Sequence, residues 1–258
     1  MRIVFLAVDD EFAGELQRVV YESHPEWIVG SVISSRLIYK KSRFGGALMV
    51  LRKSGWTFLA AMIYVKMIRR VMDRGRRVLP STLARDHGVE QFRCGNINSE
   101  DSVQRLRSWR PDLVISTNFS HYIGRTVRDS VARYGCWNLH KALLPRYRGM
   151  SPSFYALLEG APTAGATLHV VSQQLDGGDI LAQVEVPVST TDSVYSLNRK
   201  ASRAGGRLLA SFLGSYDPRV TQGVAQPQGV WKQYSYPSSG EVRAFRQKGL
   251  RFYSPGDD

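Results

Sequence analysis

What this sequence lacks excludes several classes of protein. It has two cysteines in 258 residues, Cys94 and Cys136, and neither has a CxxC partner or a histidine at metal-ligand spacing. We therefore expect buried apolar residues in a reducing compartment, not a disulfide or a metal site. There is no G-x-G-x-x-G loop, no Walker loop and no G-x-S-x-G elbow, which argues against a dinucleotide enzyme, a P-loop NTPase and an α/β-hydrolase. The first apolar run is too short for a signal peptide and is expected to be a strand.

Length and composition favour one large domain. A chain of 258 residues with 43% hydrophobic residues can bury a full core. We predict a main domain over residues 1–214, which carries a basic helical insertion at 36–77, and a short C-terminal extension over 215–258. The sequence shows no internal repeat and no low-complexity tract.

Acidic residues are scarce in one segment. The whole chain has a net charge of +13, and residues 36–77 hold twelve basic residues against one acid, Asp73, a net charge of +11. Within this segment, residues 54–65 are uncharged and include Trp56, Phe58, Leu59, Met62, Ile63 and Tyr64. The run of 54–65 is shorter than the roughly 20 residues of a membrane-spanning helix. The twelve basic residues are Arg36, Lys40, Lys41, Arg43, Arg52, Lys53, Lys66, Arg69, Arg70, Arg74, Arg76 and Arg77.

Three interpretations of this basic segment are compatible with its composition. The first is a helical insertion that packs on the domain and leaves its arginines in water. The second is a surface that binds anionic membrane lipids or a lipid-linked substrate, and the third is a site for an anionic polymer. The sequence thus predicts a cytoplasmic protein, with a peripheral position at a membrane as one alternative.

Apolar periodicity predicts alternating strands and helices. We expect strands at 3–8, 27–33, 89–93, 112–116 and 136–139, and helices at 11–23, 82–87, 99–109, 127–134, 153–158 and 194–213. This alternation is typical of an α/β fold with a mostly parallel sheet and helices on both faces. In that architecture, ligands bind at the carboxyl ends of the strands. Asn118 and His140 both follow such ends.

Three polar residues provide a chemistry for acyl transfer. Asn138 and His140 end one predicted strand, and Asp176 lies in a Leu-Asp-Gly-Gly turn. A carboxamide can hold an oxyanion, an imidazole can take a proton, and a carboxylate can orient the charged imidazole. Each residue alone has a structural explanation, because asparagine and Asp-Gly pairs form turns and a single histidine is often a core or surface residue.

The motifs around these residues resemble the 10-formyltetrahydrofolate-dependent formyltransferases. Residues 138–152 read NLHKALLPRYRGMSP, residues 165–169 read GATLH, and residues 175–183 read LDGGDILAQ. The resemblance is dense over 112–188. It implies a Rossmann-like formyltransferase fold, which makes 1–214 the catalytic domain, with 10-formyltetrahydrofolate as co-substrate and no metal. It also implies catalytic roles for Asn138, His140 and Asp176.

The resemblance also suggests binding residues. Two loops occupy the positions of the folate-binding loops, and they contain Phe119, His121, Tyr122 and Ile123 in one and Ser172, Gln173, Gln174 and Leu175 in the other. Their backbone would do most of the binding. The acceptor would lie near Tyr147, Arg148 and Tyr155, although Tyr155 could equally be a core residue of its helix. His169 could face the site or pack inward.

The acceptor amine is the open question. The 147–155 motif is most similar to sugar-nucleotide N-formyltransferases, which predicts a nucleotide-linked amino sugar. A tRNA acceptor, and nucleic acid in general, is not expected, because the sequence after 194–213 is too short for the barrel domain that methionyl-tRNA formyltransferases carry. The sequence is also compatible with a different amine, such as an amino acid or a lipid-linked amine, with a formyltetrahydrofolate hydrolase, and with a membrane-docked binding protein without turnover. A homodimer is compatible with it as well.

Overall fold

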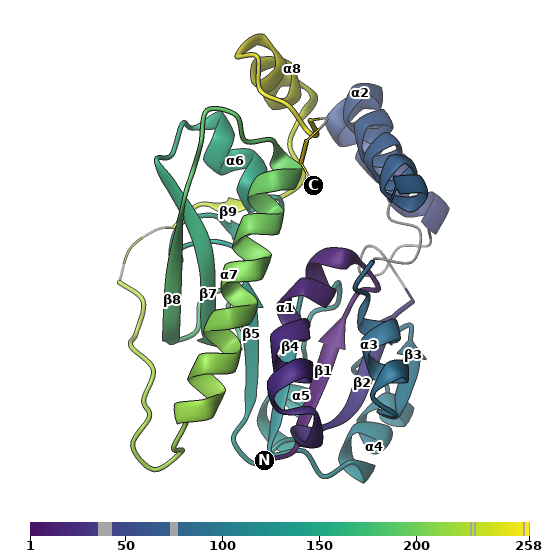
Figure 1. The fold of residues 1–258 in the computed structure, drawn as a ribbon, viewed down its shortest axis with the longest axis vertical. Helices are drawn as coiled ribbons and strands as arrows, with labels where there is room; N and C mark the ends of the chain where they lie inside the picture. Colours follow the sequence, from purple (N-terminus) through teal and green to yellow (C-terminus); the bar gives the residue numbers. More distant parts are fainter. Residues whose placement is uncertain (36–42, 73–76, 228, 230, 255, 258) are drawn as a thin grey trace.

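The computed structural model describes residues 1–35, 43–72, 77–227, 229, 231–254 and 256–257. A seven-stranded sheet runs through its centre in the order β3-β2-β1-β4-β5-β7-β8 (Figure 1). The strands from β3 to β5 are parallel, and β7 and β8 are antiparallel to their neighbours. Their bounds are Ile3–Ala7 (β1), Ile28–Ser34 (β2), Gln91–Cys94 (β3), Leu113–Thr117 (β4), Cys136–His140 (β5), Thr163–Val170 (β7) and Ile180–Pro187 (β8). The predicted mostly parallel α/β sheet is confirmed.

Helices cover both faces of this sheet. On one face, α1 (Glu11–Ser23) and α7 (Val194–Ser215) pack against alternate strand residues such as Phe5 and Leu139. On the other face, α4 (Glu100–Ser108) and α5 (Arg125–Ser130) pack against the intervening residues. Because both faces are covered, β1 is buried at every position, which explains its continuous apolar sequence. The other short elements are η1 (Pro25–Trp27) and α3 (Pro80–Asp86).

The helix that we predicted at 127–134 is shorter in the structure. α5 begins at Arg125 and ends at Ser130. The backbone N–H of Arg133 donates to Pro111 O (3.2 Å), and that of Tyr134 donates to Asp112 O (2.7 Å). Those tertiary bonds replace the helical ones, so the apolar spacing past Ser130 was wrongly assigned to a helix. The helix expected at 99–109 does begin there: Ser99 is its N-cap, and Ser99 Oγ accepts from the backbone N–H of Ser102.

The basic segment contains a long helix. α2 extends over Arg43–Met72, and its backbone leaves the helical conformation only at Gly55, where φ is +80°. Residues Phe44–Val65 are long and apolar enough to cross a membrane by length and composition, which the uncharged run 54–65 alone did not indicate. Arg36, Lys40, Lys41, Asp73, Arg74 and Arg76 of the basic segment lie outside the described residues.

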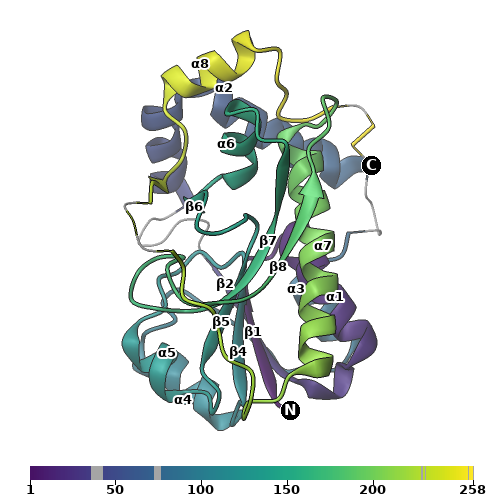
Figure 2. The same ribbon diagram turned by 90° about the vertical axis from the view of Figure 1, so that its left-hand side faces the viewer.

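The C-terminal segment runs from the amino ends of the strands back along the molecule (Figures 1 and 2). After α7, Val224 forms a bridge with Ile180 of β8. The short strand β9 (Gln233–Tyr234) then pairs with β6 (Arg148–Gly149). The chain continues into α8 (Ser239–Gln247), which packs beside α2, while α6 (Pro152–Leu158) lies beneath them. Residues 215–258 therefore cross the region of the predicted catalytic residues.

Candidate active site

Two neighbouring strands bring three polar side chains to one place. Asn138 and His140 are two residues apart on β5, so their side chains point to the same face of the sheet. His169 on β7 is the direct cross-strand partner of Asn138, and directly opposed residues share a face. His169, for which the sequence left two orientations open, therefore lies beside Asn138, and its side chain is almost fully buried.

The third predicted catalytic residue lies in the loop between β7 and β8. Asp176 has a φ of +50°, a conformation that few non-glycine residues adopt. Gly178 lies two residues later, and a Cβ at that glycine would lie 1.9 Å from the carbonyl oxygen of Val170. The Asp-Gly-Gly sequence therefore lets the loop fold tightly over the end of β7 and turn the carboxylate toward β5.

The side chains of Asn138, His140 and Asp176 converge. Asp176 Oδ2 lies 3.7 Å from Nδ1 of His140, and Asp176 Oδ1 lies 3.4 Å from Nδ2 of Asn138. The backbone N–H of Gly149 donates to Asp176 Oδ2 at 2.7 Å. Burial alone would raise the pKa of Asp176, but the positive charges of His140 and His169 in their protonated forms, together with the Gly149 N–H, outweigh it and lower that pKa to about 2. Asp176 is thus a buried carboxylate that stays charged.

Hydrogen bonds to carbonyl groups determine which nitrogen of each imidazole carries a proton. His140 Nε2 lies 2.9 Å from the carbonyl oxygen of Tyr147, and a carbonyl can only accept, so Nε2 is the donor. Nδ1 is then the nitrogen of His140 that can take up a further proton, beside Asp176. By the same argument, His169 Nδ1 donates to Val170 O at 2.9 Å.

The amide of Asn138 already has partners. Since His169 Nδ1 carries the proton, His169 Nε2 accepts from Asn138 Nδ2 at 3.1 Å. The second N–H of that amide points to Asp176 at the longer distance of 3.4 Å. An oxygen that develops negative charge next to Asn138 would therefore replace Asp176 as the acceptor of this N–H.

A residue far along the chain holds the Asp176 loop, and sequence reasoning missed it. Gln226 Nε2 donates to the carbonyl oxygens of Asp176 (2.9 Å) and Gly178 (2.8 Å). Gln226 Oε1 accepts from Arg148 Nη2 at 2.6 Å. Gln226 lies outside every motif that carries the resemblance, in a segment without regular periodicity, so the sequence offers no signal that would have identified it.

Unusual backbone conformations gather around the site. The described chain has five non-glycine residues with positive φ, of which four are Asn118, Tyr147, Ser151 and Asp176. Such conformations cost free energy and are found most often at functional sites. Ser151 precedes α6 in this conformation and makes no side-chain capping bond.

The two predicted folate loops lie next to each other. The hydroxyl of Tyr122 donates to the carbonyl oxygen of Gln173 at 3.3 Å and joins them. In the first loop, Phe119 packs on the core, Ile123 is buried, and both ring nitrogens of His121 have partners, Ser34 and the Ile97 N–H. In the second, Ser172 Oγ donates to the carbonyl oxygen of Gln174, and Leu175 is exposed. Folate binding by these loops stays a prediction.

The residues predicted to contact the acceptor are more buried than their proposed roles suggest. Arg148 is 5% exposed and donates to Gln226. Tyr155 is buried against Tyr234, with ring centroids 4.2 Å apart, and its hydroxyl donates to the carbonyl oxygen of Ser235. The carbonyl of Tyr147 holds His140, and its ring lies 5.6 Å from that of Tyr234. These three residues form the wall of the site, and direct contact with an acceptor stays a prediction.

A second polar cluster adjoins the site at the ends of β1, β4 and β5. Asn118 Nδ2 donates to Asp10 Oδ2 at 2.6 Å, and Asp10 Oδ1 caps α1. Burial raises the pKa of Asp10, although the charge of Lys141 acts in the opposite direction. Burial also lowers the pKa of Lys141, which follows His140 directly. This cluster places charged groups at the carboxyl ends of the strands, where ligands bind in such sheets.

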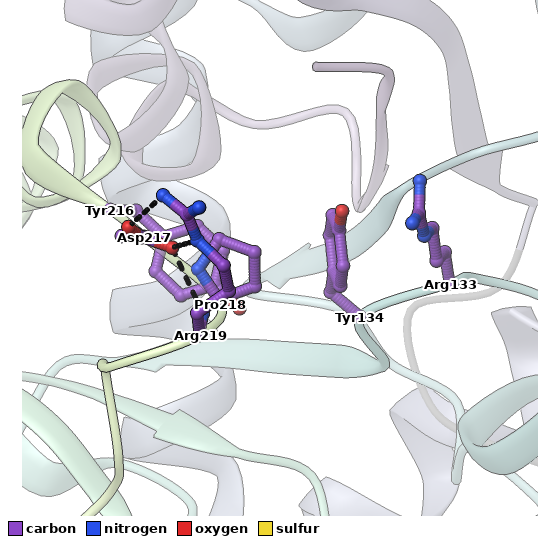
Figure 3. A pocket seen from close by; sticks show the side chains of 6 residues that line it. All are labelled: Arg133, Tyr134, Tyr216, Asp217, Pro218 and Arg219. Carbon is purple, nitrogen blue, oxygen red and sulfur yellow. Dashed lines mark hydrogen bonds and ion pairs between the residues drawn. The ribbon is translucent and has the colours of Figure 1, made fainter.

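A surface hollow of about 590 Å³ lies elsewhere (Figure 3). It is lined by Arg133, Tyr134, Tyr216, Asp217, Pro218 and Arg219. Residues 133 and 134 precede β5, so the hollow lies at the amino ends of the strands, opposite to the catalytic candidates. Two of its charged groups pair with each other, since Arg219 Nη2 lies 2.8 Å from Asp217 Oδ2. Both cysteines are buried, as expected, and burial raises the pKa of Cys136 to about 12.

The chain matches known proteins over most of this fold. A family model described as formyl transferase matches residues 37–213. A methionyl-tRNA formyltransferase from a Geobacillus species is 35% identical over 178 residues, which cover 68% of this chain and 53% of that protein. The chain therefore spans about half the length of the curated relatives that it matches.

Solved structures share the fold at lower identity. The N-formyltransferase from Helicobacter canadensis, in complex with folinic acid and dTDP-3-aminofucose, aligns with a TM-score of 0.61 at 14% identity, and the alignment covers 100% of this chain and 85% of that one. Glycinamide ribonucleotide transformylase 1 from Symbiobacterium toebii aligns with a TM-score of 0.57 at 19% identity, over 82% of this chain and 84% of that one.

Proposed function

This chain belongs to the formyl transferase family, and we propose that it moves the formyl group of 10-formyltetrahydrofolate onto a primary amine. One observation carries the proposal. The amide of Asn138, the imidazole of His140 and the carboxylate of Asp176 converge at the carboxyl end of β5. An oxyanion donor, a proton acceptor and a buried negative charge are together sufficient for acyl transfer to an amine without a covalent enzyme intermediate.

The proposed transfer begins at the formyl carbon. The amine nitrogen attacks this carbon, a C–N bond forms, and the carbonyl oxygen becomes an oxyanion. Asn138 donates to that oxygen with the N–H that otherwise points to Asp176. Nδ1 of His140 takes the proton that the amine loses, next to the Asp176 carboxylate. The bond from the formyl carbon to N10 of the folate then breaks, and the same proton passes to N10.

Asp176 contributes in two ways in this scheme. Its negative charge favours the protonated form of the His140 imidazole, which neutral surroundings would disfavour. Its position is held by Gly149 N–H on one side and by Gln226 through the loop backbone on the other. Preorganised charge of this kind needs no rearrangement during the reaction, which is why it accelerates the chemical step.

For the acceptor, we infer a nucleotide-linked amino sugar. The Helicobacter canadensis enzyme, whose structure contains dTDP-3-aminofucose, aligns with the whole of this chain, including the C-terminal segment that crosses the site. Tyr234 supplies a partly exposed ring beside the buried rings of Tyr147 and Tyr155, and Lys232 Nζ lies 4.5 Å from the centroid of the Tyr234 ring. A flat ring beside an exposed cation suits a base and a diphosphate.

A methionyl-tRNA acceptor is the second candidate. The specific observation in its favour is the 35% identity to a methionyl-tRNA formyltransferase, together with the net charge of +13. Both acceptors present a primary amine to the same three residues, so they differ only in what binds outside the reacting atoms. We propose a cytoplasmic location for the reaction, where the two buried thiols would stay reduced.

The test is release of tetrahydrofolate from 10-formyltetrahydrofolate in the presence of candidate acceptors. The panel contains dTDP- and UDP-linked amino sugars, methionyl-tRNA and free amino acids, and mass spectrometry identifies the formylated product. We expect turnover with an amino sugar nucleotide. Turnover with methionyl-tRNA alone would overturn the sugar acceptor, and formate release without any acceptor would show a hydrolase. The control is His140→Asn, which keeps the shape of the site without the proton acceptor.

A further inference from the structure

The outer surface of α2 is unusually apolar. Thirteen large hydrophobic side chains are exposed in the described part of the chain, and eight of them belong to this one helix. Their exposed fractions run from 36% at Leu48 to 80% at Phe44. The eight residues, which we call the α2 outer face, are Phe44, Leu48, Leu51, Trp56, Met62, Ile63, Tyr64 and Met67. Exposed apolar surface at this density usually marks a binding surface.

The inner side of α2 is packed on the enzyme. Val50 and Phe58 are buried in a cluster with Val242 of α8. The Phe58 ring also contacts Tyr236, Phe252 and Phe154, with ring centroids 5.5 to 6.4 Å apart. α2 is therefore attached along one side and lies at the edge of the molecule (Figure 1), and the side chains of the α2 outer face are exposed.

Six of the eight residues of the α2 outer face are spaced along one side of a helical half. Before Gly55, Phe44, Leu48 and Leu51 follow one another at intervals of four and three, which places them on a common side. After Gly55, Trp56, Ile63 and Met67 repeat this at intervals of seven and four. The break at Gly55 separates the two halves, and each half exposes apolar side chains on its outer side.

The charge around α2 identifies the partner. Residues 36–77 carry a net charge of +11, and Arg52 and Lys53, on the helix itself, are exposed. A symmetric contact with a second copy would bring two such segments together, and like charges oppose that contact. A nucleic acid would satisfy the charge but not the eight apolar side chains. An anionic bilayer satisfies both, since headgroups attract the basic residues and the acyl boundary receives the aromatic and aliphatic ones.

We propose that the α2 outer face docks this protein onto an anionic lipid surface, with both halves of α2 lying in the interface. The helix does not span the bilayer in this arrangement, because a span would remove Val50 and Phe58 from their cluster. Phe58 contacts Phe154 of α6, and α6 follows directly on the turn that holds Asp176. Docking therefore brings the acceptor side of the site close to the membrane. The proposal is independent of which amine is formylated.

Vesicle flotation tests the docking directly. The full chain is mixed with vesicles of phosphatidylcholine alone or of phosphatidylcholine with phosphatidylglycerol. We expect binding to the anionic vesicles to be at least about tenfold stronger, since each basic residue near the surface contributes about fivefold. Added salt should weaken it. Equal binding to both kinds of vesicle, or no binding to either, would overturn the proposal.

Two pairs of variants locate the surface. Trp56→Ser/Ile63→Ser/Met67→Ser should lower binding to the anionic vesicles by at least about tenfold, whereas Val220→Ser/Val224→Ser removes exposed apolar side chains outside α2 and should not. Arg52→Ser/Lys53→Ser should lower it severalfold. Arg85→Ser/Arg125→Ser removes the same charge elsewhere and should have a smaller effect. Unchanged binding by the triple variant would contradict docking through α2.

Three further measurements distinguish docking on lipid from other ways of covering the α2 outer face. Concentration-dependent self-association that the triple variant abolishes would identify a second copy as the partner and refute the lipid. Binding to duplex RNA with the same variant dependence would refute it as well. Resistance of the membrane-bound chain to alkaline carbonate extraction would show a spanning helix. Formyl transfer to a soluble amine, measured on the same preparations, should be unchanged by the α2 variants, so failure of docking and failure of the proposed function give different results.

Discussion

The catalytic candidates and α2 are opposite in polarity and burial: the candidate site buries polar side chains, and α2 exposes apolar ones. Around Asp176 and its neighbouring histidines, charged and polar groups are buried, and each is held by a hydrogen bond to Gly149, Gln226, Tyr147 or Val170. On α2, large apolar groups are exposed to water. The first arrangement is stable by itself because its polar atoms are partnered. The exposed apolar side chains of α2 are unfavourable in water, and burial against a partner surface would stabilise them.

The largest effect is expected on turnover, from a substitution among the buried polar residues of the candidate site. His140→Asn removes the nitrogen that faces Asp176 but keeps a similar side-chain volume. We expect turnover to fall by roughly 10³-fold, because general base catalysis contributes about this much. Steady-state kinetics with the best acceptor measures the loss. Unfolding temperatures within a few degrees of the parent show that the fold is kept, and retention of more than a tenth of the activity would exclude His140 as the base.

The second prediction concerns the turn that donates to Asp176. Gly149 has a φ of +94°, and a Cβ there would lie 2.2 Å from the carbonyl oxygen of Tyr234. Gly149→Ala should lower the free energy of unfolding by about 3 kcal/mol, through unfavourable φ and the clash with β9. Gly135→Ala is the matched control, since Gly135 also has positive φ but nothing lies within 4 Å of its Cβ position. It should lose about 1 kcal/mol, and denaturant unfolding of the two separates the contributions.

The third prediction is a dependence of stability on pH. The folded-state pKa of Asp176 is about 2, below its ordinary value of 3.8. A lowered pKa stabilises the fold above the unfolded value, and the contribution is lost as the pH falls from about 4 toward 2. We expect a loss of roughly 2 kcal/mol over this window. Urea unfolding at a series of pH values should show the loss in the parent and a clearly smaller one in Asp176→Asn. Equal slopes would mean that the carboxylate is not stabilised in the fold.

The fourth prediction tests Gln226 as a positioning residue. Gln226→Ala removes both bonds to the Asp176 loop and the acceptor for Arg148. We expect kcat to fall by about tenfold with little change in KM, because the loop moves while the binding surfaces remain. The acid side of the pH–rate profile should also shift. Gln247→Ala, on the exposed end of α8, is the control. A fall in stability without a change in kcat would indicate a structural role alone.

The smallest effect is expected on the outer side of α2. Trp56→Ala should change the free energy of unfolding by no more than about 0.5 kcal/mol, because this side chain is 70% exposed. Phe58→Ala, two residues away on the inner side, should cost about 3 kcal/mol through the cavity that it leaves. Thermal unfolding compares them. Similar losses from both substitutions would show that the outer side of α2 is packed in solution.

The regular parts of the fold could be predicted because their signals are local. The apolar runs of β1 and β4 and the capped start of α4 each specify an element within a few residues. Asn138 and His140 could be placed at the carboxyl end of a parallel strand, where ligands bind. Asp176 was placed with them by the resemblance, since its loop follows β7, which runs antiparallel to β5. His169 remained open, since its side depends on the register between β5 and β7.

The remaining features depend on contacts between distant segments. Gln226 acts through the carbonyl groups of a loop about fifty residues earlier, and nothing in its neighbours indicates that contact. The helix predicted past Ser130 ends because residues 133 and 134 bond to 111 and 112. The apolar length of Phe44–Val65 was not visible in the sequence, because Arg52 and Lys53 lie within it and only 54–65 is uncharged. A charged residue does not end a helix. A glycine at position 55 in the sequence also does not show whether the helix bends or is interrupted there.

The position of Gln226 near the end of the chain sets an order of events during synthesis. The residues that would perform the chemistry leave the ribosome first, and the residue that fixes the Asp176 loop leaves later, followed by β9, which closes over the turn at Gly149. A nascent chain can therefore form the whole sheet before its catalytic loop is fastened. Docking of the segment that carries Gln226 and β9 is then the step that completes the candidate site on a scaffold that has already folded.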